Sequence, residues 1–231
     1  MRAIAVMALP LGLSFILSMF LRSAAAVIAP EIRTELDLGA TELGALTAAL
    51  FLGSAAMQLP AGLMLDRLGP RRTIATCQLV GAAGAASMLY VSNIYGLALA
   101  WFAMGVGVAP IYMGMIVLYS RWVPRDRLAQ ASAISVAIGG MGFLLSSSPF
   151  AAASVWLGWR LAMASIGGLA LLFSILVMTL VRDRPRDMPT PEGPPESFGE
   201  VVRGLLFVMR DRRVYLLAAM ASLSFSTIMS V

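Results

Sequence analysis

The sequence predicts an all-α polytopic membrane protein, and two observations support that fold class. First, 59% of the 231 residues are hydrophobic and only 13% are charged, whereas about a quarter of the residues in an ordinary soluble domain are charged. Second, the charged residues stand in short clusters between long uncharged runs, and each run can hold one or two of the roughly 20-residue helices that cross a bilayer. The uncharged runs are 43–65, 73–120, 128–159, 161–181 and 214–231.

These runs hold six expected membrane helices, and the apolar stretch before them, which contains Arg22, holds a seventh. The run 73–120 has to hold two helices, because a single helix of 48 residues would be about 70 Å long. The run 128–159 holds one helix and an outer end where Trp156 and Trp159 suit the aromatic belt of a membrane interface. The expected helices are 4–29, 42–65, 73–91, 95–119, 129–153, 160–181 and 213–231.

The arginines predict the orientation of these helices. If the N-terminus is cytoplasmic, 14 of the 17 basic residues, all of them arginine, fall on the cytoplasmic side. Arg33 and Arg160 alone lie in outer segments, and Arg22 lies within the first helix. This bias follows the positive-inside rule and favours a bacterial inner membrane protein with a cytoplasmic N-terminus. Because the net charge of +5 comes from these clusters, we expect the lipid bilayer as a partner and no nucleic acid.

Three regions follow from this pattern. Residues 1–181 form a six-helix transmembrane bundle. Residues 182–212 are rich in proline and charge, as expected of a cytoplasmic linker, and apolar residues at helical spacing near 198–210 predict an amphipathic helix on the membrane surface. Residues 213–231 are the start of a second bundle, so we expect the chain to lack the C-terminal part of a longer protein.

The composition argues against enzymatic chemistry. The sequence has no histidine, and its one cysteine, Cys77, lies inside an apolar run. It contains no intramembrane pair of carboxylates and no Gly-x-Ser-x-Gly nucleophile motif. We therefore expect no catalytic residue, no metal site and no cofactor, and an intramembrane enzyme is the least favoured alternative.

A charged loop between the second and third helices carries the most specific pattern. An arginine cluster alone would serve orientation, but acidic residues contribute little to orientation, so Asp66 needs another explanation. Gly62 is expected to permit a close helix contact, and Gly69 with Pro70 is expected to form a tight turn. The candidate gating residues are Gly62, Asp66, Arg67, Gly69, Arg71 and Arg72.

This G-x-x-x-D-R-x-G-x-R-R pattern resembles the signature of the major facilitator superfamily, where it also lies between helices two and three. The resemblance implies two six-helix bundles, each a 3+3 repeat, joined by a cytoplasmic linker. It also implies a gate in which Asp66 faces a helix N-terminus of the other bundle, an arrangement that the helix dipole stabilises. Four further segments are similar to the anion-transporting branch: Leu21-Arg22-Ser-Ala-Ala-Ala-Val-Ile-Ala-Pro30, Gln58-Leu-Pro60-Ala-Gly62, Trp122-Val-Pro124-Arg125 and Gly158-Trp159-Arg160.

Two departures from the family pattern weaken a drug/proton antiporter. Family members often have an arginine in helix four where this sequence has Trp101. The helix-five signature of many antiporters, Gly-Pro followed by Gly-Gly, is absent.

Arg22 is the one charge well inside an expected crossing, about 12 Å below the outer end of the first helix. An arginine in this position costs several kcal/mol unless it faces a water-filled cavity or a partner. It could line a cavity and bind an anionic group such as a carboxylate. Alternatively, it could reach the outer surface or pair with Glu31 or Asp37.

Three other residues at similar depth are candidate substrate contacts. Trp101 is expected near the depth of Arg22, where its ring would suit a substrate with an acidic and an apolar part. Gln58 and Tyr112 are expected near mid-membrane, where they could donate hydrogen bonds to a substrate. Interfacial anchoring for Trp101, and helix packing for Gln58 and Tyr112, are the alternatives.

Together these observations predict a transporter of a small solute, an organic anion in particular, that works by alternating access. No acidic residue or histidine lies inside a crossing, so proton coupling would need a group in the missing second half. The alternatives are a proton-coupled drug or metabolite exporter and a transporter-like receptor without net flux.

Overall fold

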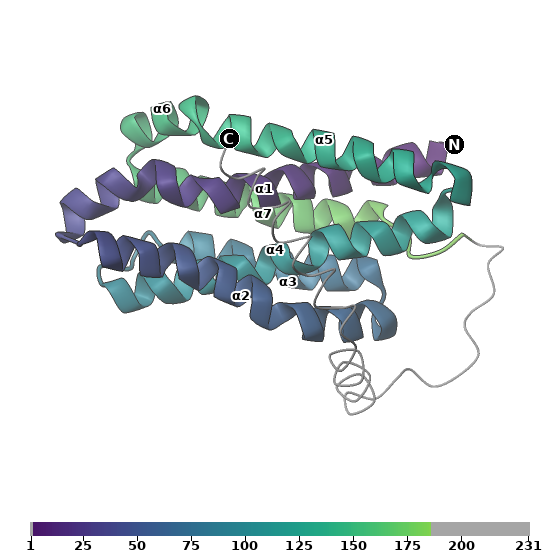
Figure 1. Cartoon of the computed structure of the whole chain (residues 1–231), viewed down its shortest axis with the longest axis horizontal. Helices are drawn as coiled ribbons and strands as arrows, with labels where there is room; N and C mark the ends of the chain where they lie inside the picture. Colours follow the sequence, from purple (N-terminus) through teal and green to yellow (C-terminus); the bar gives the residue numbers. More distant parts are fainter. Residues whose placement is uncertain (1, 186–231) are drawn as a thin grey trace, which may run out of the picture. The chain divides into compact units, whose positions relative to one another are not determined.

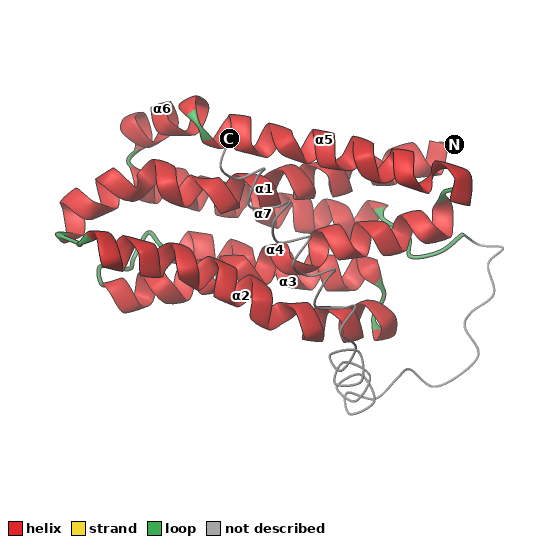
Figure 2. Cartoon of the chain, viewed as in Figure 1, coloured by secondary structure: helices red, strands yellow, loops and turns green. Residues whose placement is uncertain are grey.

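The computed structural model describes residues 2–185, with side chains from Val6 onward. This range is built from helices joined by short loops and contains no strand (Figure 2). It belongs to one unit that spans Met1–Pro189, and a second unit spans Thr190–Val231. The amphipathic helix expected near 198–210 and the crossing expected at 213–231 lie outside the described residues.

Seven α-helices and one short 3₁₀ turn make up the described chain (Figure 1). Five of the helices, α1, α2, α4, α5 and α7, are long and apolar enough to cross a membrane. The third expected crossing corresponds to α3, which is shorter and more polar because it begins with Pro-Arg-Arg and contains Gln78. The helices are α1 Arg2–Leu36, α2 Ala40–Arg67, α3 Pro70–Ser87, α4 Ile94–Trp122, α5 Leu128–Ser146, α6 Ser148–Leu157 and α7 Trp159–Leu180, with the 3₁₀ turn at Arg125–Arg127.

The first helix extends beyond its expected end. The prediction placed the end of the helix at residue 29, before Pro30, but α1 continues through Pro30 to Leu36. Proline removes one backbone hydrogen bond and bends a helix without necessarily ending it. The hydroxyl of Thr34 donates to the carbonyl of Pro30 at 2.9 Å and supports this turn.

The prediction of a single helix over 129–153 is wrong, because α5 ends at Ser146 and α6 begins at Ser148. Between them, Ser147 has φ −80° and ψ −115°, which is outside the helical region. Pro149 cannot donate to the preceding turn. The hydroxyls of Ser146 and Ser147 donate to carbonyls three residues earlier, at 2.8 and 2.7 Å, and so compete with the helical pattern.

The helices pack in a fixed order of neighbours. Helix α2 lies against α4, α4 against α3, α3 against α7, and both α7 and α5 lie against α1 (Figure 1). Glycine makes the closest of these contacts possible. A Cβ on Gly53 would lie 2.2 Å from the carbonyl oxygen of Phe102, and a Cβ on Gly105 would lie 2.0 Å from that of Leu50, so α2 and α4 meet backbone to backbone.

A cluster of hydrogen bonds around Arg160 joins α1, α7 and the chain after α3. Its Nε and Nη2 atoms each lie 2.9 Å from Oε1 of Glu35. Its Nη1 atom donates to the carbonyls of Met88, at 2.8 Å, and Val91. The indole of Trp159 donates to the other oxygen of Glu35 at 2.5 Å, and the Arg160 guanidinium lies 4.5 Å from the centre of the Trp159 ring. All three nitrogens of this guanidinium are therefore bonded.

Candidate functional site

Arg22 lies on α1 and turns its guanidinium toward α2. Its Nη2 atom donates to the hydroxyl of Ser54 at 3.5 Å, and its Cζ atom lies 5.9 Å from the centre of the Phe51 ring. Its Nε atom is buried and has no hydrogen-bond partner. The one hydrogen bond is long, so this guanidinium keeps donor capacity that an anion could use.

Gln58 shares a face of α2 with the two residues that contact Arg22. Phe51, Ser54 and Gln58 are separated by three and four residues, the spacing that places side chains on one side of a helix. Gln58 is exposed and follows Ser54 by about 6 Å along the helix axis. Gln58, a predicted substrate contact, therefore lies on the face of α2 that contacts Arg22.

Tyr112 lies beside α1. Its ring stacks on that of Phe15, with ring centres 5.3 Å apart, and its side chain is 41% exposed. Phe15 precedes Arg22 by seven residues, or two helical turns, so both lie on one face of α1. The structure thus brings Tyr112 to the face of α1 that carries Arg22, about 10 Å along the helix from it.

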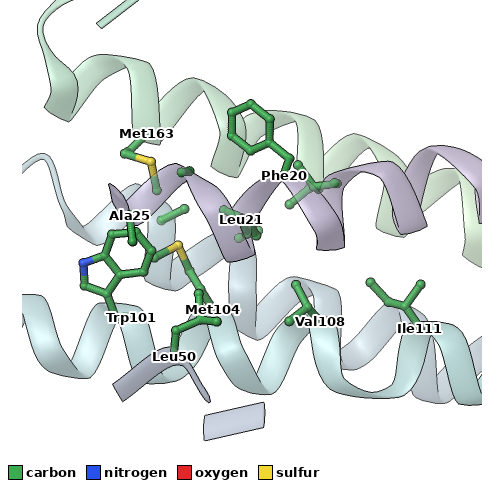
Figure 3. Close-up of a cluster of buried hydrophobic side chains, with 14 of the residues drawn as sticks. Phe20, Leu21, Ala25, Leu50, Trp101, Met104, Val108, Ile111 and Met163 are labelled. Atoms are coloured by element: carbon green, nitrogen blue, oxygen red, sulfur yellow. The ribbon is translucent and has the colours of Figure 1, made fainter. Parts of the chain in front are cut away.

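Trp101 occupies the core of the bundle. It is 1% exposed, and its ring lies beside Ala25 and Met104 (Figure 3). Its indole Nε1 atom is buried and has no partner. The aromatic ring that contacts Arg22 is that of Phe51, and no contact between Trp101 and Arg22 is seen among the described residues.

Three residues near Arg22 were missed in the sequence, and helical spacing is the signal that could have found them. Phe51 lies two turns and Ser54 one turn before Gln58, and Phe15 lies two turns before Arg22. Their types gave no signal, because phenylalanine and serine are common in membrane helices.

A cavity of about 540 Å³ lies at the C-terminal end of α1, beside Glu31 and Glu35. The Glu31 carboxylate accepts a hydrogen bond from the hydroxyl of Ser154 at 2.8 Å, and Arg22 does not line this cavity. The residues that line it include two carboxylates and no arginine, so this cavity does not suit an anionic substrate. Within residues 2–185, no group of three histidine, cysteine or acidic side chains could hold a metal ion.

The charged loop lies between α2 and α3, as expected. Asp66 and Arg67 close the last turn of α2, and both are exposed. Asp66 interacts electrostatically with Arg121 at the end of α4. A Cβ on Gly62 would meet no atom within 4 Å, so the expected close helix contact at Gly62 is not seen among the described residues.

Gly69 and the two arginines after it surround the start of α3. Gly69 has φ +82°, the left-handed conformation that permits the tight turn expected there. Arg72 is exposed, whereas Arg71 is half-buried, and the backbone N–H of Arg71 donates to a carboxylate oxygen of Asp183 at 2.7 Å. Asp183 is a further residue that the sequence did not single out.

The apolar helices and their packing define an all-α integral membrane protein whose helices form a bundle. The chain belongs to the Major Facilitator Superfamily, which it matches over residues 11–231. Its fold resembles that of a bacterial homologue of the human lysosomal transporter Spinster, solved in an inward-facing and unoccupied conformation. The TM-score is 0.67 at 20% identity, over 83% of this chain and 46% of that one.

Curated relatives include a probable L-galactonate transporter of Escherichia coli, which is 31% identical over 71% of this chain and 36% of its own length. A probable sulfoacetate transporter of Cupriavidus necator is 24% identical over 69% of this chain and 37% of its own. A hexuronate transporter of Bacillus subtilis is 23% identical over 72% of this chain and 39% of its own. The chain thus spans less than half of the length of these proteins.

Proposed function

We propose that the whole protein transports a small organic anion across the membrane by alternating access, and that Arg22 binds a carboxylate of that substrate. The observation that carries the proposal is the half-buried guanidinium of Arg22, which has one long hydrogen bond and an Nε atom without a partner. An arginine at this depth is costly, and a bound anion would offset that cost. The names of the relatives support the substrate class, since galactonate, sulfoacetate, hexuronate and tartrate are all small organic acids.

The surroundings of Arg22 fit a sugar acid or a similar hydroxy acid. The guanidinium can take a carboxylate through two parallel hydrogen bonds, and the Phe51 ring beside it shields that pair from water. Gln58 and Tyr112, on neighbouring helices, offer an amide and a hydroxyl for the hydroxyl groups of such a substrate. Trp101 is a proposed substrate contact only if the core around it opens, because its ring is buried.

The test is uptake by the full-length protein in proteoliposomes, with a hexonate and the neutral hexitol of the same carbon chain as the two candidates. Arg22→Ala should lower hexonate uptake by at least about 30-fold, because truncating one partner of a buried charge pair costs about 2–5 kcal/mol. Arg22→Lys should recover part of it, since lysine keeps the charge without the planar fork. The matched control is Arg33→Ala, which removes an exposed arginine of the same helix. An equal loss for hexonate and hexitol would rule out an anion site at Arg22.

We also propose that the charged loop gates the cytoplasmic side, through Asp66 together with Gly62, Arg67, Gly69, Arg71 and Arg72. The exposure of Asp66 supports a contact with the second bundle, and a carboxylate is stabilised at a helix N-terminus. In the full-length protein, Asp66→Asn should change both the transport rate and the labelling of cytoplasmic-side cysteines. Unchanged values for both would exclude a gating role.

The bias of arginine toward one side supports a cytoplasmic N-terminus in a bacterial inner membrane. Reporter fusions after residues 38, 92 and 158 should be active in the periplasm, and fusions after residues 69 and 126 should be active in the cytoplasm. The reverse pattern would overturn this orientation.

The remaining proposals are that the protein acts as a transporter and not an enzyme, uses no cofactor, and is completed by a second bundle after a linker at 182–212.

A further inference from the structure

Asp183 lies three residues beyond the end of α7, and its carboxylate reaches the first turn of α3. Its Oδ1 atom accepts the backbone N–H of Arg71 at 2.7 Å. Arg71 is the second residue of α3, so this N–H has no acceptor within its own helix. A carboxylate at this point also interacts favourably with the helix dipole.

Gly69 makes room for this carboxylate. A Cβ on Gly69 would lie 2.6 Å from Oδ2 of Asp183 and 2.8 Å from its Cγ, so the carboxylate would have to shift away from its present position. The φ of +82° adds a second reason for glycine at this position. Glycine at this point of the loop therefore suits the turn and leaves the Asp183 carboxylate in contact with the first turn of α3.

The end of α4 holds the backbone around Asp183. The Nη1 atom of Arg121 donates to the carbonyl of Asp183 at 3.2 Å, and the indole of Trp122 donates to the carbonyl of Arg182 at 3.0 Å. The chain after α7 is thus bonded to α4 through its backbone and to α3 through its side chain. One residue connects the ends of three helices at the cytoplasmic edge of the bundle.

We propose that Asp183 is the positioning residue of the loop between α2 and α3: it fixes where α3 begins, and so sets how the loop presents Asp66 to the other bundle. Arg121 takes part in both halves of this arrangement, because it bonds the backbone of Asp183 and interacts electrostatically with Asp66. This role rests on the proposed gating function of the loop. It also ties the first residues after α7, where the linker is expected to begin, to the position of the gate.

The test measures the accessibility of the loop in the full-length protein without substrate. Leu68→Cys places a thiol at an exposed position of the loop, while Cys77 is buried and stays as it is. In inside-out vesicles, the rate at which a membrane-impermeant maleimide labels Leu68→Cys should rise about tenfold with Asp183→Ala, since both a charge-assisted hydrogen bond and a dipole interaction are lost. Asp183→Asn, which keeps an acceptor oxygen but loses the charge, should give a smaller rise. The matched control is Asp126→Ala, which removes an exposed acid of the 3₁₀ turn after α4.

Two further measurements separate positioning from a general loss of stability. Gly69→Ala should raise the labelling rate as Asp183→Ala does, and the double variant should show no further rise, because both changes break one contact. Asp183→Asn should lower kcat for the transported anion and leave KM unchanged, since Arg22 lies on α1 and contacts Ser54 and Phe51 of α2. Labelling equal to that of Asp126→Ala, additive effects in the double variant, or a change in KM alone would each overturn the proposal.

The labelling experiment can be distinguished from the test of substrate class. It needs no substrate, so a failure of Arg22 to select anions would leave its result unaffected. Conversely, unchanged labelling by Asp183→Ala would remove the positioning role without touching the anion site.

Discussion

Arg22 and Arg160 are two arginines at opposite extremes of hydrogen bonding. The Arg160 side chain is 23% exposed, and each of its three nitrogens has an acceptor from Glu35 or from a backbone carbonyl. The guanidinium of Arg22 has one hydrogen bond at 3.5 Å and an Nε atom without a partner. Both residues contact a neighbouring helix, but only Arg160 has a hydrogen-bond partner for each of its nitrogens.

This difference separates a structural role from a binding role. Buried polar groups of folded proteins are nearly always hydrogen-bonded, and a group left unsatisfied needs an explanation. Every nitrogen of the Arg160 guanidinium already has an acceptor, so its effect is to hold α1 and α7 together. Burial removes water from the Arg22 guanidinium, and one long hydrogen bond does not replace the lost hydration. This is the state expected of a group that binds a ligand.

Of the changes that test this difference, the largest effect is expected for a substitution of Arg160. Arg160→Gln removes the ion pair with Glu35 and leaves two backbone carbonyls without their donor. Since hydrogen bonds to charged groups contribute about 1.5–3 kcal/mol and Glu35 is partly exposed, we expect a loss of about 2–3 kcal/mol in stability. The reaction of buried Cys77 with a thiol-reactive dye during heating would report the lower unfolding temperature.

The matched control for this variant is Arg33→Gln, which removes an exposed arginine near the same end of α1. Its unfolding temperature should equal that of the unaltered protein, and KM for the anion should be unchanged in both variants. If Arg160→Gln raised KM without lowering the unfolding temperature, Arg160 would contribute to anion binding and not to the stability of the bundle.

An intermediate effect is expected at Ser54, the hydrogen-bond acceptor of Arg22. Ser54→Ala removes a long hydrogen bond that orients the guanidinium. We expect KM for the anion to rise about threefold, because such a bond contributes of the order of 0.5–1 kcal/mol. The unfolding temperature should stay the same, since serine and alanine are similar in size, and uptake by proteoliposomes gives KM. An unchanged KM would show that Ser54 does not orient Arg22.

The sequence predicted the parts of the fold that depend on local patterns. Uncharged runs located the membrane helices, and a lone charge within such a run identified Arg22, because both signals come from neighbouring residues. The break at Ser147 could not be predicted in this way. Pro30, Pro60 and Pro110 all lie inside unbroken helices, so Pro149 gave no reason to expect a break.

The contacts that were missed depend on how helices rotate against one another. Asp183 looked like one charge among several in a linker, and its bond to Arg71 joins residues 112 positions apart. The position of Trp101 along α4 was predictable, because it follows the polar break at Ser92-Asn93 by eight residues. The side of α4 that its ring faces was not predictable, because that depends on the packing of α1, α2 and α3 around α4.

The smallest effect is expected at Trp101, and it decides whether this residue belongs with Arg22 or with Arg160. Its indole N–H is buried without a partner, so Trp101→Phe removes an unsatisfied donor at the same time as it leaves a small gap in the core. These two changes oppose each other, and we expect the stability to change by less than about 1 kcal/mol. KM and kcat for the anion should then stay within about twofold of the unaltered values, a change of about 0.4 kcal/mol. A loss of uptake greater than about tenfold at unchanged stability would mean that the core around Trp101 opens during transport and that its N–H, like the Nε of Arg22, is kept free for the substrate.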